Sequence, residues 1–141
     1  MQITAAHLDA FGRLTGLRLH DSELIELAFV AGRSLTLKLR RVDGTIATLQ
    51  ALDPARVGII EFQANPIVAN AYAWLPTSST EPHLSTCIRA WRTLFGQTVD
   101  GPHLEEAITA LRSKHPRAIL FHCECSYGGE IAVLCESLEG E

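Results

Sequence analysis

Apolar and polar residues alternate through residues 34–40, which predicts a β-strand with one buried face. An apolar stretch at 24–30 precedes it, and Ala31-Gly32-Arg33 between the two predicts a hairpin. Asp43-Gly44 is a turn signal that leads into a third strand at 45–52. The sequence leaves the length of this turn open, so Leu37 is expected opposite Gln50 or, with a longer loop, opposite Leu49 or Ala51.

Two further apolar stretches, at 57–62 and 67–74, predict additional strands separated by turns at Asp53-Pro54 and Asn65-Pro66. The alanines of 67–74 also allow a helix there. A last hairpin is expected from 118–125 and 130–138 around Ser126-Tyr127-Gly128-Gly129. Its odd-numbered residues form an apolar face, which places Cys123 and Cys125 in the core, with Cys123 opposite Val133 if the loop has three residues.

Three- and four-residue spacing of apolar residues predicts the helices. A short amphipathic helix is expected from Thr4 to about Leu14, ending near Gly16. A longer one follows a cap within 77–80 and stops at Gly96, and its Ile88, Trp91 and Phe95 are expected to lie on the sheet. A third helix begins at Pro102 and ends before Pro116, with acidic residues in its first turn and basic residues in its last.

Together these elements predict an α+β fold. We expect an antiparallel sheet of about six strands, with the N-terminal helix and the helix pair packed on one face. The chain has 141 residues, of which 47% are hydrophobic and 20% charged, close to ordinary globular usage. One globular domain spanning residues 1–141 is therefore expected.

Location and redox state follow from what the chain contains. Its apolar stretches are shorter than the ~20 residues of a membrane span, and its first residues lack the basic start and apolar run of a signal peptide. The sequence thus predicts a soluble cytoplasmic protein without membrane contact. Its four cysteines are then expected to be reduced thiols rather than a disulfide framework.

Negative charge is concentrated at the C-terminal end. The net charge is −4, and residues 121–141 contain five glutamates and neither lysine nor arginine, so this segment carries −5 and the rest +1. Such a segment repels phosphate backbones and attracts cationic partners. The pattern argues against nucleic-acid binding. A solvated acidic edge that discourages aggregation explains the same pattern nearly as well.

His122, Cys123, Cys125 and Cys135 are the candidates for metal or thiol chemistry. Three thiolates and a histidine could hold zinc, but in a regular strand His122 points away from the cysteines. Buried, unreactive thiols are the favoured interpretation. The sequence therefore predicts no cofactor and no metal-binding or catalytic residue, and an enzyme that uses these four residues is kept as an alternative.

Two short motifs resemble small, mostly uncharacterised bacterial proteins found beside polymorphic toxins. Leu19-His20-Asp21-Ser22 is similar to their L-H-D-[AS] start, and the segment from Ser126 to Cys135 is similar to their S-Y-G-x-x-I-x-x-x-C end. The match covers roughly residues 17–75 and 118–138. The resemblance implies immunity proteins, which are non-catalytic β-rich domains that bind and block a toxin.

The resulting functional expectation is a cytoplasmic immunity protein that neutralises a toxin domain with a basic surface. The residues expected to bind the partner are Tyr127 at the turn of the C-terminal hairpin and Glu124, Glu130 and Glu136 on its outer side, where no cation within residues 121–141 neutralises them. A secretion chaperone is the alternative among binding proteins.

Overall fold

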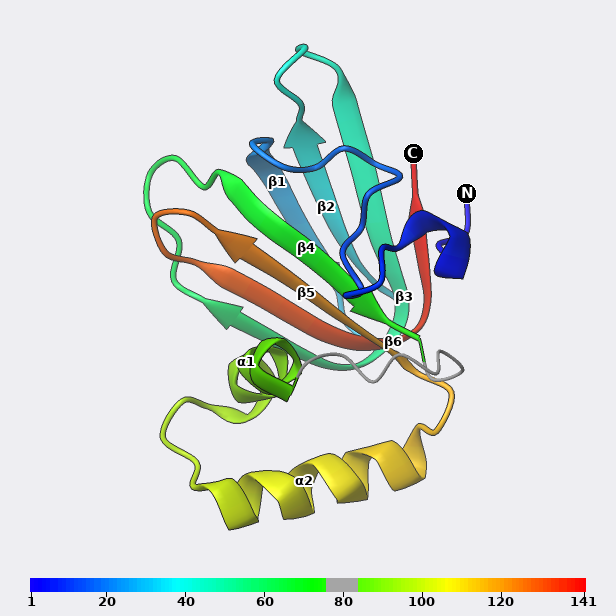
Figure 1. The fold of residues 1–141 in the computed structure, drawn as a ribbon, viewed down its shortest axis with the longest axis vertical. Helices are drawn as coiled ribbons and strands as arrows, with labels where there is room; N and C mark the ends of the chain where they lie inside the picture. The colour runs from blue at the N-terminus through cyan, green and yellow to red at the C-terminus, as the bar shows by residue number, and fades with distance from the viewer. Residues whose placement is uncertain (76–83) are drawn as a thin grey trace.

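Over residues 1–75 and 84–141, a computed structural model of the chain contains one six-stranded antiparallel sheet and two α-helices (Figure 1), so the expected α+β class is confirmed. The structure describes residues 1–75 and 84–141, with side chains described from residue 87 onward in the second part. The strand order is β1-β2-β3-β6-β5-β4. The strands are β1 (Glu23–Val30), β2 (Ser34–Arg40), β3 (Ile46–Ile60), β4 (Val68–Trp74), β5 (Ile119–Cys125) and β6 (Glu130–Gly140).

The sheet curls until its two edge strands meet at one end. The Val68 amide donates to the Ser22 carbonyl at 2.8 Å, and the Asp21 amide donates to the Val68 carbonyl at 2.9 Å. A bridge between Glu23 and Ile67 continues this contact into β1. The curl encloses an apolar interior and satisfies part of the free edge of β4.

The N-terminal segment does not form the expected amphipathic helix. Only a 3-10 turn is present, η1 (Ala5–His7), after which the Ala73 amide donates to Gly12 and the Leu14 amide donates to Ala71. Residues 12–14 thus extend the sheet along the edge of β4, and these tertiary hydrogen bonds override the weak helical preference of so short a segment. The segment also lies on the opposite side of the sheet from the helices, not on the same face as expected.

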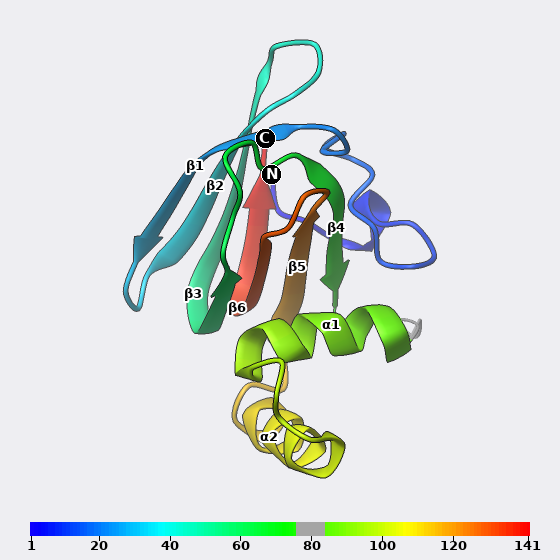
Figure 2. The same cartoon turned by 90° about the vertical axis from the view of Figure 1, so that its left-hand side faces the viewer.

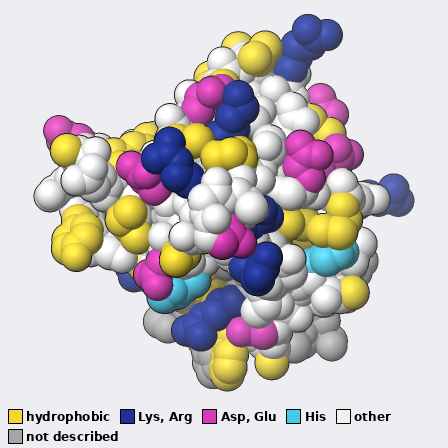
Figure 3. All heavy atoms as spheres, turned by 90° about the horizontal axis from the view of Figure 1, so that it is seen from above, with side chains coloured by type: hydrophobic (Ala, Val, Ile, Leu, Met, Phe, Trp, Pro, Cys, Tyr) yellow, Lys and Arg dark blue, Asp and Glu magenta, His cyan; other side chains and the backbone are white. Residues whose placement is uncertain are grey.

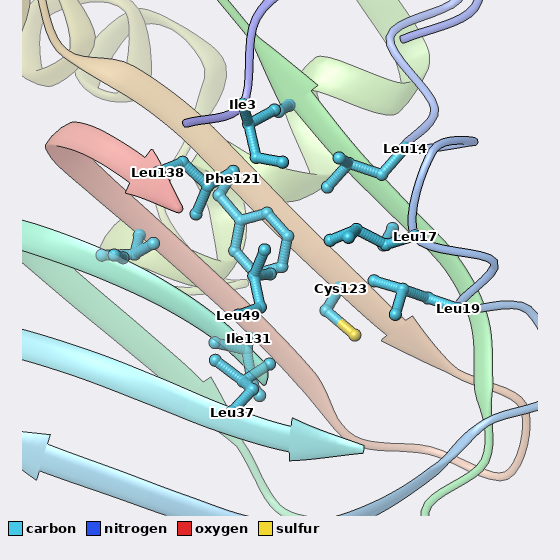
Figure 4. Close-up of a cluster of buried hydrophobic side chains, with 14 of the residues drawn as sticks. Ile3, Leu14, Leu17, Leu19, Leu37, Leu49, Phe121, Cys123, Ile131 and Leu138 are labelled. Carbon is cyan, nitrogen blue, oxygen red and sulfur yellow. The ribbon is translucent and has the colours of Figure 1, made fainter. Parts of the chain in front are cut away.

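Two apolar cores lie on the two sides of β4, β5 and β6. Figure 4 shows the first, where Phe121 and Cys123 point toward Ile3, Leu17 and Leu19 of the N-terminal segment. The second core lies between the sheet and the helices. It contains Tyr72, Trp74, Ala90, Trp91, Leu94, Leu104, Ala118, Leu120, Ala132 and Leu134. All of β5 is therefore buried, including the even-numbered face that was expected to meet solvent.

Strand register follows the loop lengths. Leu37 pairs with Leu49, which was one of the open alternatives for this hairpin, and the loop spans residues 41–45. In the last hairpin, Cys123 pairs with Ile131 rather than Val133, because the last paired residues are Glu124 and Glu130 and the turn is therefore centred on residue 127 rather than 128. The two-residue difference leaves the apolar face unchanged, so Cys123 and Cys125 are buried as expected.

Strand β3 is continuous where two strands and a turn were expected. The strand has an irregularity between Pro54 and Arg56, and Asp53 adopts a φ of 48°. The pairing with β2 ends at Leu52, so beyond this point β3 pairs with β6 alone. The missing N–H of Pro54 is tolerated because this part of β3 is an edge.

Helix α1 (Leu84–Phe95) lies between the sheet and α2 (Gly101–Lys114), as Figure 2 shows. Gly96 ends α1 with a φ of 111°, as expected for a C-terminal glycine. Trp91 is buried as predicted, but Ile88 is 38% exposed, because the buried side of the helix is centred on Ala90, Trp91 and Leu94. The cap expected within 77–80 falls outside the described residues. Asp100 caps α2 by accepting a hydrogen bond from the His103 amide.

Candidate functional site

The residues expected to bind a partner occupy three different environments. Tyr127 lies in the turn between β5 and β6 and is 67% exposed. Glu136 is also exposed. Glu124 is only 8% exposed, and it faces α1 together with the half-buried Glu130. The expected outer position is therefore wrong for Glu124 and Glu130, because a helix covers the side of the hairpin to which even-numbered residues point.

A cation outside the C-terminal segment compensates these two glutamates. The Arg89 guanidinium, on α1, bridges Glu124 and Glu130: its Nη1 pairs with Oε1 of Glu124 and its Nη2 with Oε1 of Glu130. The neutralising cation thus comes from α1, outside residues 121–141. Two carboxylates still face a single guanidinium, so this group of side chains keeps an excess of negative charge.

His122 completes the group, which we call the polar cluster: Arg89, His122, Glu124 and Glu130. The imidazole is fully buried, and its Nε2 lies 3.4 Å from Oε2 of Glu130. Nδ1 has no hydrogen-bond partner among the described residues. The Tyr72 ring stacks on the imidazole with centroids 6.4 Å apart. Burial lowers the pKa of His122, with the nearby glutamates opposing the shift, so the ring is neutral at pH 7.

Neighbouring polar groups orient both carboxylates. The Thr93 hydroxyl lies 2.8 Å from Oε2 of Glu130, and the Asn70 side-chain amide donates to Oε2 of Glu124 at 3.2 Å. Burial by itself would raise the pKa of Glu130, but Thr93 together with His122 and Arg89 lowers it below its ordinary value. Glu130 is therefore ionised at pH 7 and held in one orientation.

A pocket of about 440 Å³ opens beside the polar cluster. Glu130 and Arg89 line it on one side, and residues of the β5–β6 turn line it on the other. The full lining is Ile60, Arg89, Gln97, Cys125, Ser126, Gly128, Gly129 and Glu130. Its volume lies within the range of small-molecule and side-chain pockets, about 300 to 1,000 Å³. The charged pair is thus accessible from solvent through this pocket.

The two motifs behind the sequence resemblance meet at the start of β4. Asp21 and Ser22 exchange backbone hydrogen bonds with Val68, and the Ser126 amide donates to the carbonyl of Ile67 at 2.8 Å. The motifs are about a hundred residues apart in sequence, and β4 joins them in space. Asp21 adopts a φ of 62°, in keeping with its place in a tight turn.

The proposed combination of His122 with the three cysteines does not form. His122 faces α1, whereas Cys123 and Cys135 lie in the core on the opposite side of the sheet. Burial raises the pKa of Cys135 to about 12, and a hydrogen bond with Cys125 together with burial raises that of Cys123. These thiols keep their protons and lack the thiolate form that ligates metal or attacks a substrate.

Thiol labelling tests this interpretation. In the native protein, a maleimide is expected to modify the half-buried Cys87 and to leave Cys123 and Cys135, which are at most 1% exposed, until the protein unfolds. Mass spectrometry of peptides after timed labelling, with and without denaturant, identifies the modified residues. Rapid native labelling of Cys123 or Cys135 would contradict the assignment of these residues to the core.

Sequence reasoning missed the contributions of Arg89, Thr93 and Asn70 to the site. All three approach the C-terminal hairpin from other elements, so spacing within the hairpin holds no sign of them. The sequence nevertheless contained an indication that the even-numbered face of this hairpin is also buried. Residues 131–135 are apolar without interruption, which is typical of a strand covered on both sides.

Comparison of the chain with family models, with curated proteins and with solved structures finds no match. The resemblance to immunity proteins therefore depends on the two short motifs described above. Among the described residues, no helix is long and apolar enough to cross a membrane.

Proposed function

We propose that the protein is a non-catalytic immunity protein that binds and neutralises a cognate bacterial toxin domain. The observation that carries the proposal is the position of Tyr127. This aromatic residue is 67% exposed in the β5–β6 turn, directly beside the pocket lined by Glu130 and Arg89. Exposed aromatic residues next to a pocket are typical of the residues that dominate binding energy at protein interfaces.

The charge distribution favours a partner with a basic surface. Beside the pocket, the polar cluster keeps two carboxylates for one guanidinium, whereas the exposed Glu136 and Glu139 lie further along β6. Elsewhere the charges are mixed. Figure 3 shows lysine and arginine side chains interspersed with aspartate and glutamate on the face seen from the top of Figure 1. The end of the molecule that carries the pocket is therefore the better candidate for contact with a cationic domain.

The proposal is tested with the product of the neighbouring gene, which the proposal expects to contain the toxin domain. Tyr127→Ala is expected to weaken binding about thirtyfold or more, because a truncated anchor residue typically costs about 2 kcal/mol or more at an interface. Calorimetry measures the affinity, and growth of cells that express the toxin domain measures neutralisation. Val42→Ala is the matched control, since Val42 is 80% exposed on the distant β2–β3 loop, and it is expected to leave both readouts unchanged.

Two outcomes would contradict the proposal. If the neighbouring gene product is neither bound nor neutralised, the immunity function is rejected. If the protein instead forms a dimer that binds an unfolded segment of its neighbour, the secretion-chaperone alternative replaces it. Equal binding by Tyr127→Ala and wild type would move the interface away from the β5–β6 turn.

A further inference from the structure

We propose that His122, Glu124 and Glu130 form a binding site for a divalent transition-metal ion, and that Arg89 occupies the place of the ion when the metal is absent. One neutral imidazole and two carboxylates suit Zn²⁺, Mn²⁺, Fe²⁺ and Co²⁺. The inference departs from the expectation of a protein without metal ligands. It does not depend on the proposed immunity function.

The distances within the group suit a shared ion. One ligand atom from each of the three side chains lies within 4.8 Å of the other two. The His122 Nε2 and Glu130 Oε2 atoms are 3.4 Å apart, which is long for a hydrogen bond to a carboxylate. Two tetrahedral ligand atoms, each about 2.1 Å from an ion, lie about 3.4 Å apart, so this pair already has the separation of metal ligands.

The histidine is the second observation that points to a ligand. Its ring is fully buried, with no hydrogen-bond partner at Nδ1 among the described residues and only the long contact at Nε2. Buried polar side chains are normally well hydrogen-bonded, because an unpaired polar atom in the interior costs free energy. A metal ion bound at Nε2 would replace this long contact by a coordinate bond to the imidazole.

Outer hydrogen bonds hold both carboxylates in place for an ion. Thr93 contacts Oε2 of Glu130, and Asn70 donates to Oε2 of Glu124. Partners of this kind orient ligands and raise metal affinity in known metal sites. The ion pairs of Arg89 use Oε1 of both glutamates, so the guanidinium marks where positive charge is stabilised between them.

Arg89 can leave this position. Its side chain is 56% exposed, whereas those of Glu124 and Glu130 are 10% and 15% exposed. Replacing one guanidinium by a divalent ion would balance the two carboxylate charges, which the arginine alone does not. Glu130 also lines the 440 Å³ pocket, so water can reach the remaining coordination position of the ion from that side.

Titration with Co²⁺ tests the proposal, because its visible spectrum reports the ligands. His122→Gln and Glu130→Gln are each expected to weaken binding roughly tenfold or more, since loss of even an outer partner costs 10–100-fold. Arg89→Gln is expected to tighten binding, because it removes the competing cation. The spectrum of the cobalt-bound protein should lack thiolate-to-cobalt charge-transfer bands, because no cysteine belongs to the proposed site. His103→Gln, at an exposed histidine paired with Asp100, is the control for adventitious surface binding and should change nothing.

Unfolding curves for every variant show which ones are folded. Arg89→Gln is at an exposed helix position, so it keeps the test decisive if a variant at a buried position does not fold. Unchanged or weaker Co²⁺ binding by Arg89→Gln would overturn the proposal. So would thiolate bands, or an affinity insensitive to both His122→Gln and Glu130→Gln in folded protein. If the wild-type protein binds no Co²⁺ but still binds the toxin domain, this inference alone is rejected, which separates it from the proposed function.

Discussion

Replacing Trp91 by alanine is expected to lower the free energy of unfolding by about 3 to 5 kcal/mol, the usual cost of removing a large buried aromatic side chain. Trp91 is 5% exposed and lies in the core between α1 and the sheet, with Leu120 and Leu134 in the same core. Its ring stacks on Phe95 with centroids 6.3 Å apart, and the Arg112 guanidinium lies 5.4 Å from the ring centroid. The substitution therefore removes packing and leaves a cavity at the contact that holds α1.

Urea denaturation followed by circular dichroism measures this loss. Ile88→Ala is the matched control on the same helix, because its side chain is 38% exposed, and it is expected to cost about 1 kcal/mol or less. A loss below about 1 kcal/mol for Trp91→Ala would mean that the indole is not buried under α1. Trp91 would then be available as a contact for a partner.

Replacing Gly58 by alanine is expected to destabilise the protein by about 3 kcal/mol or more, at or above the upper end of ordinary overpacking. Helix α1 crosses β3 so closely that a Cβ at Gly58 would lie 2.1 Å from the Thr93 carbonyl oxygen and 2.9 Å from the Leu94 Cα. Both are backbone atoms and cannot rotate away. The helix must shift, which also disturbs the contact between Thr93 and Glu130 in the polar cluster.

The control for Gly58→Ala is Gly101→Ala, in the first turn of α2. No atom lies within 4 Å of a Cβ added there, and alanine favours the helix, so stability is expected to be unchanged or slightly higher. Thermal unfolding of the two variants gives the comparison. Equal melting temperatures for Gly58→Ala and the wild type would show that α1 does not pack directly on β3.

The local patterns of the chain determine most of its elements. The alternation of Leu35, Leu37 and Leu39 predicts β2 and its buried face, because side chains of a strand point to opposite sides in turn. The spacing through Trp91 and Leu94 predicts α1, and Gly96 marks its end. The apolar parity of Cys123 and Ile131 predicts that the cysteines are buried. Each of these features depends on neighbours within a few residues or one hairpin.

The tertiary structure alone decides the features that depend on distant contacts. Residues 12–14 are extended because β4 offers them backbone hydrogen bonds, and β3 continues past Pro54 because β6 still pairs with it there. The polar cluster has the same origin: α1 covers the even-numbered face of the last hairpin and brings Arg89 to Glu124 and Glu130. The sequence by itself thus determined which residues form strands and helices and which of their faces are apolar. Which second surface covers each face was decided only by the packing of segments far apart in the chain, because periodicity within one segment holds no record of its partner.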